Sequence, residues 1–186
     1  MAVKTLNKEE IKDLYNKDFY QWIVENVELL KNKEFNLVDW ENVIEELESM
    51  GRSELRSVIS FMTVILEHLY KYEHFRENET MGNSWIDSID NARTELEWLF
   101  NDSPSLKRKA QEEIDLAWKS AVKRLIKWFK KPENHHLAKK YFGKIPTEQD
   151  FPEICPYTFR QILEYEPWIE KQGGIIWKNQ AFWMCF

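Results

Sequence analysis

The stretch SELRSVISFMTVILEHLYKY, residues 53–72, is the most apolar helical pattern in the chain and decides its fold. Its apolar side chains recur at steps of four, three, four, three and three residues, which places them on one face of a helix. Ser53 stands where it can cap the start of this helix. We therefore expect a central helix whose stripe consists of Leu55, Ile59, Met62, Leu66, Leu69 and Tyr72.

Two helices are expected on the N-terminal side of this stretch. Asn7 and Glu10 have the spacing of a capping box, and the apolar face that follows predicts one helix of about six turns. Asp39 stands where it can cap a second helix, which Gly51 is expected to break or bend. The two apolar faces consist of Ile11, Tyr15, Phe19, Ile23, Val27 and Leu30, and of Trp40, Ile44, Leu47 and Met50.

On the C-terminal side the sequence predicts two more long helices, followed by a proline-rich stretch without long helical periodicity. Ser84 is the expected cap of one helix, and Ser103 followed by Pro104 is a strong start signal for the other, which ends before Pro132. Prolines recur beyond that point and predict short helices near residues 134–142 and 157–165, joined by extended segments. The two long helices carry Trp85, Ile89, Ala92, Leu96 and Leu99, and Ile114, Trp118, Ala121, Leu125 and Trp128.

Together these patterns predict an all-α fold. Helix pairs joined by short loops pack antiparallel, so we expect an up-and-down helical bundle of about five main helices with a Pro-rich C-terminal strap and short helices. The bundle domain is expected over residues 1–168. Residues 169–186 are expected to form an aromatic tail. Its part from Ile175 to Phe186 is expected to fold back on the bundle or contact a second chain, because its apolar surface is large. The residues predicted to be largely buried are Trp22, Leu47, Met62, Leu66, Leu69, Ile89, Leu96 and Leu125.

Composition narrows the class of protein. The chain has 186 residues, of which 43% are hydrophobic and 15% aromatic, which is enough to build a core and excludes global disorder. Lys and Arg number 26 against 32 Asp and Glu, and the formal charge of −6 disfavours binding of nucleic acid or anionic lipid over the whole surface. No apolar run approaches the ~18 residues of a membrane span, so no membrane partner is expected. The chain has no apolar signal segment near Met1 and only two cysteines, Cys155 and Cys185, so a cytoplasmic protein is expected.

Several stretches of the sequence occur together in one known family. They are YNKDFYQW at 15–22, DWENVIEELESMG at 39–51, LEHL at 66–69, DSPSL at 102–106 and FPEICPYT at 151–158. In this order they resemble the domain of unknown function family number twenty-nine, which is found mostly in cyanobacteria, and the resemblance covers about residues 10–168. It implies an all-helical bundle, in agreement with the periodicity, and it implies no activity. The tail after Trp168 falls outside the resemblance.

The first candidate site is a polar cluster of Glu45, Glu46, Glu48, His68 and Arg93. These groups border the apolar stripes of three helices that are expected to be adjacent in the bundle. The Glu-x-x-His spacing of di-metal bundles is missing, so no metal is predicted. We favour an interhelical ion-pair network, in which the Arg93 guanidinium serves two carboxylates, over a functional site that opens to a pocket.

The second candidate is a basic face between residues 107 and 131. Lys119, Lys123, Lys127 and Lys130 lie along one side of the expected helix, where the phosphate backbone of a nucleic acid could lie. Three acidic residues near the start of the helix interrupt the row of positive charges. A solvated helix face is therefore the favoured interpretation.

Two further motifs carry weaker signals. His135 and His136 diverge on a helix and lack a third ligand at suitable spacing, which favours a solvent-exposed pair. The run from Cys155 to Thr158 shows no base for a nucleophilic thiol and is interpreted as a structural strap in which Thr158 caps a short helix. No phosphate-binding loop, dinucleotide fingerprint or metalloprotease helix occurs in the sequence, and no cofactor is predicted.

Three functions are compatible with the sequence. The favoured one is a small cytoplasmic helical binding or interaction protein without catalysis, because catalytic motifs are missing while Trp and Tyr, which are typical of binding surfaces, are abundant. A protein partner or self-association is then the expected kind of interaction. One alternative is a metal-assisted hydrolase or nuclease that uses Glu45, Glu46, Glu48 and His68. The other is a nucleic-acid-associated regulator that uses the basic face.

Overall fold

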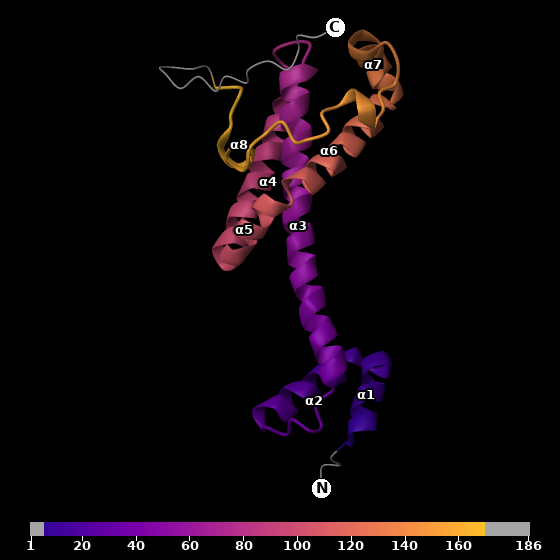
Figure 1. Ribbon diagram of the computed structural model, residues 1–186, viewed down its shortest axis with the longest axis vertical. Coiled ribbons are helices and arrows are strands. Elements are labelled where there is room, and N and C mark those ends of the chain that lie inside the picture. The colour runs from indigo at the N-terminus through magenta and orange to yellow at the C-terminus, as the bar shows by residue number, and fades with distance from the viewer. Residues whose placement is uncertain (1–5, 170–186) are drawn as a thin grey trace. The chain divides into compact units, whose positions relative to one another are not determined.

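The computed structural model describes residues 6–169, and within them it contains eight α-helices, two 3-10 helices and no strand (Figure 1). The predicted all-α class is therefore confirmed. None of the described helices is both long and apolar enough to cross a membrane. In chain order the elements are α1 (Lys8–Lys17), α2 (Phe19–Lys31), α3 (Trp40–His74), α4 (Asn83–Asp102), α5 (Pro104–Glu112), α6 (Ile114–Phe129), η1 (Pro132–Asn134), α7 (His135–Phe142), η2 (Glu148–Asp150) and α8 (Phe159–Glu164).

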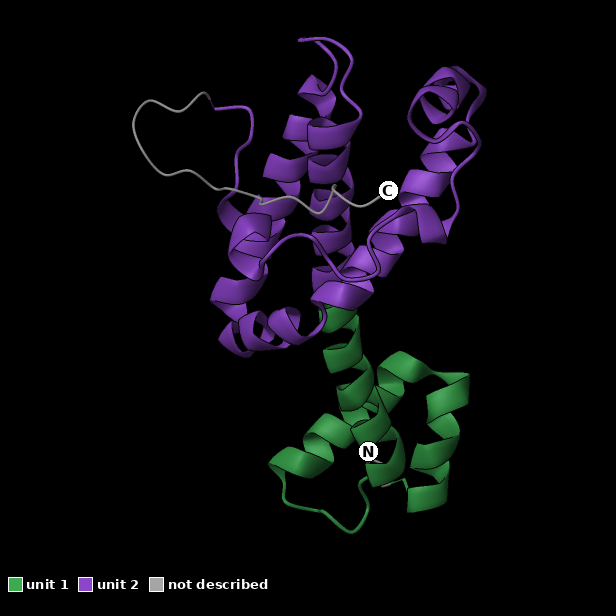
Figure 2. Cartoon of the chain, turned by 45° about the horizontal axis from the view of Figure 1, so that its top comes forward, with its two compact units in different colours: residues 1–56 green, residues 57–186 purple. Residues whose placement is uncertain are grey.

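The chain divides into two compact units, residues 1–56 and residues 57–186 (Figure 2). Unit 1 holds α1, α2 and the first part of α3, and unit 2 holds the rest of α3 and all later helices. The sequence predicts one bundle domain over residues 1–168, whereas the structure divides this range after Arg56. Apart from Ile169, the predicted aromatic tail lies outside the described residues.

Unit 1 begins with two short helices where the sequence predicts one long helix. The capping box at the start of α1 is confirmed, because Glu10 N donates to Asn7 Oδ1 at 3.0 Å and Asn7 N donates to Glu10 Oε2 at 2.9 Å. The helix stops at Asp18, whose φ of −152° is not helical and whose carboxylate accepts a hydrogen bond from Gln21 N at 3.1 Å. Aspartate favours a cap over a helix interior, so the apolar period continues across a break in the backbone.

A small core with a buried polar centre holds unit 1 together. Trp22 Nε1 donates to Asp39 Oδ2 at 3.0 Å, and Asn42 Nδ2 donates to the same oxygen at 2.6 Å. Asp39 N donates in turn to Asn26 Oδ1 at 3.0 Å. A buried carboxylate is costly unless it is hydrogen-bonded, so this network fixes how the loop before α3 meets α2. The buried apolar members of the core are Ile11, Trp22, Leu29 and Val38, which confirms the prediction for Trp22.

The predicted break at Gly51 is wrong, because α3 runs without interruption from Trp40 to His74. A glycine ends a helix by adopting a positive φ, and Gly51 is not among the residues that do so. In a helix interior a glycine costs only about 1 kcal/mol relative to alanine, less than the burial of the apolar stripe that follows it contributes. The two helices predicted at residues 39–50 and 53–72 are therefore parts of one helix and cannot lie side by side.

The apolar stripe at the start of α3 is exposed, so the predicted burial of Leu47 is wrong. Leu47 has 63% of its surface accessible. The core of unit 1 contacts another side of the helix, where Val43 packs and where Glu46 Oε1 accepts a hydrogen bond from Tyr15 OH at 2.6 Å. Periodicity identifies an apolar face but does not show whether anything covers it. The other exposed members of the stripe are Trp40, Ile44 and Met50.

Unit 2 is built around the apolar half of α3. α4 runs alongside α3, α6 crosses it, and the segment between α7 and α8 passes over α3 (Figure 1). The contact between α3 and α6 includes a buried hydrogen bond from Thr63 Oγ1 to Ala117 O at 3.3 Å. The predicted helix from Ser103 onward is interrupted at Glu113, whose φ of −103° separates α5 from α6. All the core residues that the sequence predicts here are fully buried: Met62, Leu66, Leu69, Ile89, Leu96 and Leu125.

The turn between α3 and α4 depends on Gly82. Its φ of +112° is a conformation that L side chains rarely adopt, and a Cβ at this position would lie 3.0 Å from Tyr72 Cδ2. Gly82 O accepts the hydrogen bond from Ile86 N at 3.0 Å that starts α4. The helix therefore begins at Asn83, and Gly82 occupies the cap position in place of the predicted Ser84.

We predict that Leu66→Ala lowers the free energy of unfolding by roughly 2–5 kcal/mol, because it opens a cavity in the core of unit 2. Leu116→Ala is the matched control, since Leu116 lies on α6 with its side chain exposed, and it should change the free energy by less than about 0.5 kcal/mol. Urea denaturation followed by circular dichroism measures both. A loss below about 1 kcal/mol for Leu66→Ala would show that this face of α3 is not the core.

Candidate functional site

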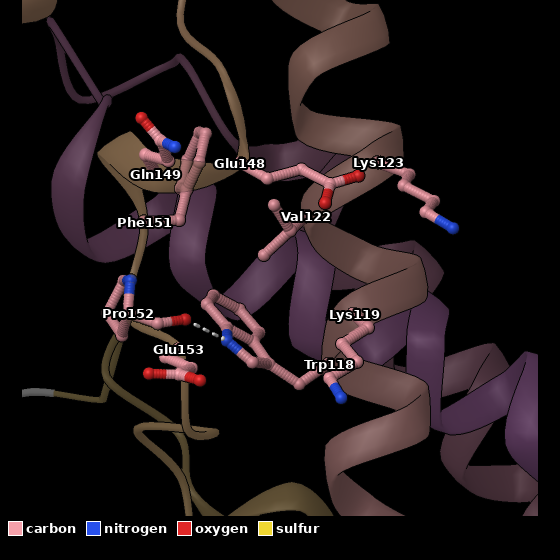
Figure 3. A pocket seen from close by; sticks show the side chains of 9 residues that line it. All are labelled: Trp118, Lys119, Val122, Lys123, Glu148, Gln149, Phe151, Pro152 and Glu153. Carbon is pink, nitrogen blue, oxygen red and sulfur yellow. Dashed lines mark hydrogen bonds between the residues drawn. The ribbon is translucent and has the colours of Figure 1, made fainter.

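The candidate site is a groove on unit 2, between α6 and the segment that contains η2 (Figure 3). Its volume is about 520 Å³. α6 contributes one wall, and the segment from η2 to residue 153 contributes the other. The lining residues are Trp118, Lys119, Val122, Lys123, Glu148, Gln149, Phe151, Pro152 and Glu153.

The helical period of α6 explains how one wall of the groove forms. Trp118 and Val122 are one turn apart and buried, so they form part of the floor. Lys119 and Lys123 follow each of them by one residue, which places both ammonium groups along the same exposed edge.

The second wall is tied to α6 by a hydrogen bond from inside the core. Trp118 Nε1 donates to Pro152 O at 2.7 Å (Figure 3). Phe151 is buried beside it and completes the apolar floor. The 3-10 helix η2 is closed by a capping box between Thr147 and Asp150, in which Thr147 N donates to Asp150 Oδ2 at 2.7 Å. These contacts hold the wall in place.

The rims of the groove carry opposite charges. Lys119 and Lys123 stand on α6, while Glu148 and Glu153 stand on the facing segment, and Glu148 extends toward α6 in Figure 3. Within residues 6–169, none of these four side chains makes an ion pair within 4.0 Å. Each charge is therefore available to a bound molecule.

The groove uses half of the predicted basic face. Lys119 and Lys123 line it, whereas Lys127 and Lys130, although also exposed, are not among the lining residues. The sequence reasoning missed the opposite wall, from Glu148 to Glu153. One signal for it was readable, namely Thr147 and Asp150 at capping-box spacing, but nothing in the sequence pairs this segment with α6.

The residues of the predicted polar cluster are divided between the two units. Glu45, Glu46 and Glu48 belong to unit 1, while His68 and Arg93 belong to unit 2. The prediction required adjacent helices over residues 39–50 and 53–72, and these residues form one continuous helix. Within unit 1 the acids have local roles, since Glu46 accepts from Tyr15 and Glu48 pairs with Arg52 at 3.1 Å.

Arg93 holds the end of α8, so its predicted pairing with carboxylates of the second helix is wrong. Its Nε donates to Ile162 O at 2.9 Å, and its Nη2 donates to Tyr165 O at 2.8 Å and to Gln161 O at 3.3 Å. The last carbonyls of a helix have no partner within the helix, and a guanidinium fork can satisfy several of them at once. Burial lowers the pKa of Arg93.

Unit 2 contains buried and half-buried acidic and basic side chains that the sequence reasoning did not select. Glu67 and Lys71, one turn apart on α3, form a buried ion pair. Glu73 accepts hydrogen bonds from the hydroxyls of Tyr157 and Tyr165, the latter at 2.7 Å. The four-residue spacing of Glu67 and Lys71 was visible in the sequence, whereas the tyrosines are distant along the chain.

His68 is a half-buried imidazole whose neutral form is favoured. Burial, reinforced by the nearby charge of Lys71, lowers its pKa to about 4. Its Nδ1 is buried without a hydrogen-bond partner among the described residues. The residues described contain no group of three or more His, Cys, Asp or Glu side chains that could hold a metal.

The weaker motifs have structural contacts. His135 and His136 are both exposed, as expected, and His136 Nε2 lies 3.1 Å from Glu77 Oε2. Burial raises the pKa of Cys155 to about 12, so its thiol stays protonated. Cys155 N donates to Asp115 Oδ1 at 3.1 Å, and Thr158 caps α8 by accepting from Gln161 N at 3.2 Å. The segment therefore acts as a strap.

We predict that His68 makes the fold less stable in mild acid. The unfolded chain binds a proton on this residue near the ordinary pKa of 6.5, whereas the folded protein binds it only near pH 4. Falling pH in this interval therefore favours unfolding. In His68→Leu the free energy of unfolding should decline less between pH 6.5 and 4 than in the unmodified protein, as measured by urea titration at each pH.

His135→Leu is the control for this measurement, because His135 is an exposed histidine. It should leave the pH dependence as it is in the unmodified protein. An equal pH slope in His68→Leu and in the unmodified protein would contradict the assignment of a neutral, half-buried His68.

Comparison with known proteins gives one family. A family model described as "Domain of unknown function DUF29" matches residues 14–168, which agrees with the family indicated by the sequence segments. The matched range includes both walls of the groove. Searches of curated proteins and of solved structures give no match.

Proposed function

Because the chain belongs to the DUF29 family, whose description assigns no reaction, we propose a function from the groove itself: a binding protein without catalysis that takes a small organic zwitterion. Such a ligand has an anionic group, a cationic group and an apolar body. The observation that supports this class is the pair of oppositely charged rims over an apolar floor.

The charged rims match the two ends of a zwitterion. Lys119 and Lys123 are one turn apart, so both ammonium groups can bind a single carboxylate or phosphate. Glu148 and Glu153 can bind a cationic group from the opposite side. Since these four side chains have no ion pairs among the described residues, binding does not require an existing pair to be broken.

The floor of the groove suits the apolar part of the ligand. Val122 and Phe151 provide apolar surface above the buried Trp118. A volume of about 520 Å³ lies within the range of small-molecule sites. Apolar contact supplies affinity, and the charged rims orient the molecule.

Two observations support binding over catalysis. Catalysis by a thiol requires a thiolate, and Cys155 is held in its protonated form. Metal-assisted hydrolysis requires converging ligands, and the described residues contain no such cluster.

The proposal includes a cytoplasmic location in a cyanobacterium. The free thiol of Cys155 supports the first part, because reducing compartments keep thiols unpaired. The resemblance to a mostly cyanobacterial family supports the second part.

The zwitterion proposal predicts a ranking among matched ligands. Phenylalanine, N-acetylphenylalanine and phenylalanine amide share the ring, but the second lacks the cation and the third lacks the anion. Isothermal titration calorimetry on the full chain should show saturable binding of phenylalanine, and binding of each derivative weaker by roughly tenfold or more. Equal affinity for all three molecules, or no binding of any, would contradict the proposal.

Variants then locate the binding in the groove. Lys123→Met should weaken phenylalanine binding by roughly tenfold, because it removes one charge from the anion-binding rim. Lys127→Met is the matched control, since Lys127 is exposed one turn further along α6 and outside the groove, and it should bind as the unmodified protein does. Equal losses in both variants, together with salt-dependent binding of an oligonucleotide, would favour the nucleic-acid alternative.

A further inference from the structure

We infer that unit 2 has a second binding site, separate from the groove, that takes an uncharged planar heterocycle of the nucleobase type. The site is a cavity of about 520 Å³ among the end of α3, α7 and the segment of η2. Among the described residues, only Gln149 lines both the cavity and the groove. The inference therefore does not rest on the zwitterion proposal.

The first step is that aromatic side chains form much of the cavity wall. The ring centre of the buried Phe75 lies 5.2 Å from that of Tyr141 and 5.7 Å from that of Phe142. Tyr70 extends this cluster, with 5.8 Å between its ring centre and that of Phe75. Tyr141 is exposed and Phe142 half-buried, so aromatic surface stays accessible. Flat ring systems bind such surface by stacking, which favours a planar ligand.

The second step is that the charges at the cavity are already paired. Among the described lining residues, Asp150 alone carries a full charge, and its Oδ1 lies 3.0 Å from Lys144 Nζ while its Oδ2 accepts from Thr147 N at 2.7 Å. Lys140 on α7 pairs with Glu77 Oε1 at 2.8 Å. An ion that leaves water for this cavity gains no unpaired opposite charge on its wall. An uncharged ligand leaves each of these pairs intact.

The third step is that two neutral polar side chains of the wall lack partners. The side chains of His74 and Gln149 make no hydrogen bond or ion pair with any described residue. The His74 ring packs against Tyr70 with 4.1 Å between ring centres, and the loss of water contact lowers the pKa of His74, which favours its neutral form. Glu148 extends toward α6, whereas the Gln149 amide lies farther from that helix (Figure 3). Both polar groups therefore offer one side that donates and one that accepts.

A nucleobase matches these three features together. Its faces stack on aromatic rings, it is uncharged at neutral pH, and its edge carries a donor next to an acceptor. The amide of Gln149 can bind such an edge through two hydrogen bonds at once, and His74 can bind a further polar atom. A volume of about 520 Å³ lies within the range of sites for molecules of nucleoside size.

A titration of the full chain with adenosine tests the site. Nuclear magnetic resonance should show saturable shifts of the His74 imidazole signals, with a dissociation constant at or below about 1 mM, while the signals of the exposed His135 stay in place. Purine riboside, which lacks the exocyclic amino group, should bind roughly tenfold more weakly, because one of the two hydrogen bonds to Gln149 is lost. Binding of ribose alone, or no binding of adenosine, would overturn the inference.

Variants locate the bound base. His74→Leu and Gln149→Leu should each weaken adenosine binding by roughly tenfold, as measured from the signals of adenosine itself, while circular dichroism shows that both proteins are folded. His135→Leu is the control for an exposed histidine, and Lys123→Met is the control for the groove; both should bind adenosine as the unmodified protein does. A loss in Lys123→Met equal to that in His74→Leu would place adenosine in the groove and overturn the second site.

Phosphorylated ligands test whether the site takes an uncharged molecule. Adenosine monophosphate and a short oligoadenylate carry the same base with added negative charge. Both should bind no more tightly than adenosine, because the lining residues offer no unpaired cation. A gain of about tenfold or more in either ligand, lost at high salt, would overturn the assignment to a free, uncharged heterocycle.

Discussion

The ammonium group of Lys71 has to be neutralised inside unit 2, and the arrangement of three helices follows from that requirement. Lys71 is only 3% exposed, and an unpaired buried ammonium costs several kcal/mol. Glu67 pairs with it from one turn earlier on α3, and the ammonium nitrogen lies 4.9 Å from the ring centre of Trp128 and 5.9 Å from that of Trp85. Because Trp85 belongs to α4 and Trp128 to α6, one charge fixes how both helices lie against α3.

Local sequence signals predicted the helices well and their ends less well. The capping box at Asn7, the start at Pro104 and the buried half of α3 depend on residues close together in the chain, so they were readable. The breaks at Asp18 and Glu113 and the continuity at Gly51 depend on small differences in backbone energy. The spacing of apolar residues continues unchanged across such positions, so the sequence pattern does not reveal where a helix breaks or continues.

Only one wall of the groove could be predicted from the sequence, because the groove joins segments that are distant along the chain. The lysines of α6 form a pattern within one helix, whereas their partner wall comes from a strap that is tied down by Trp118. Arg93 illustrates the same limit, since its partners are backbone carbonyls at the end of α8 rather than side chains. A sequence shows which side chains carry charge. It does not show which backbone carbonyls are left without a partner at the end of a distant helix.

The turn at Gly82 bears on how this family can diverge. A Cβ at that position meets Tyr72 and Trp85 at 3.0–3.2 Å while the backbone stays at a positive φ, so tight contact and backbone strain both disfavour residues other than glycine. Lineages that keep the turn between α3 and α4 are thus held to glycine there, whatever their ligand. A glycine retained at this position would record a folding requirement, and a mutational survey that scores only activity would mistake it for part of a binding site.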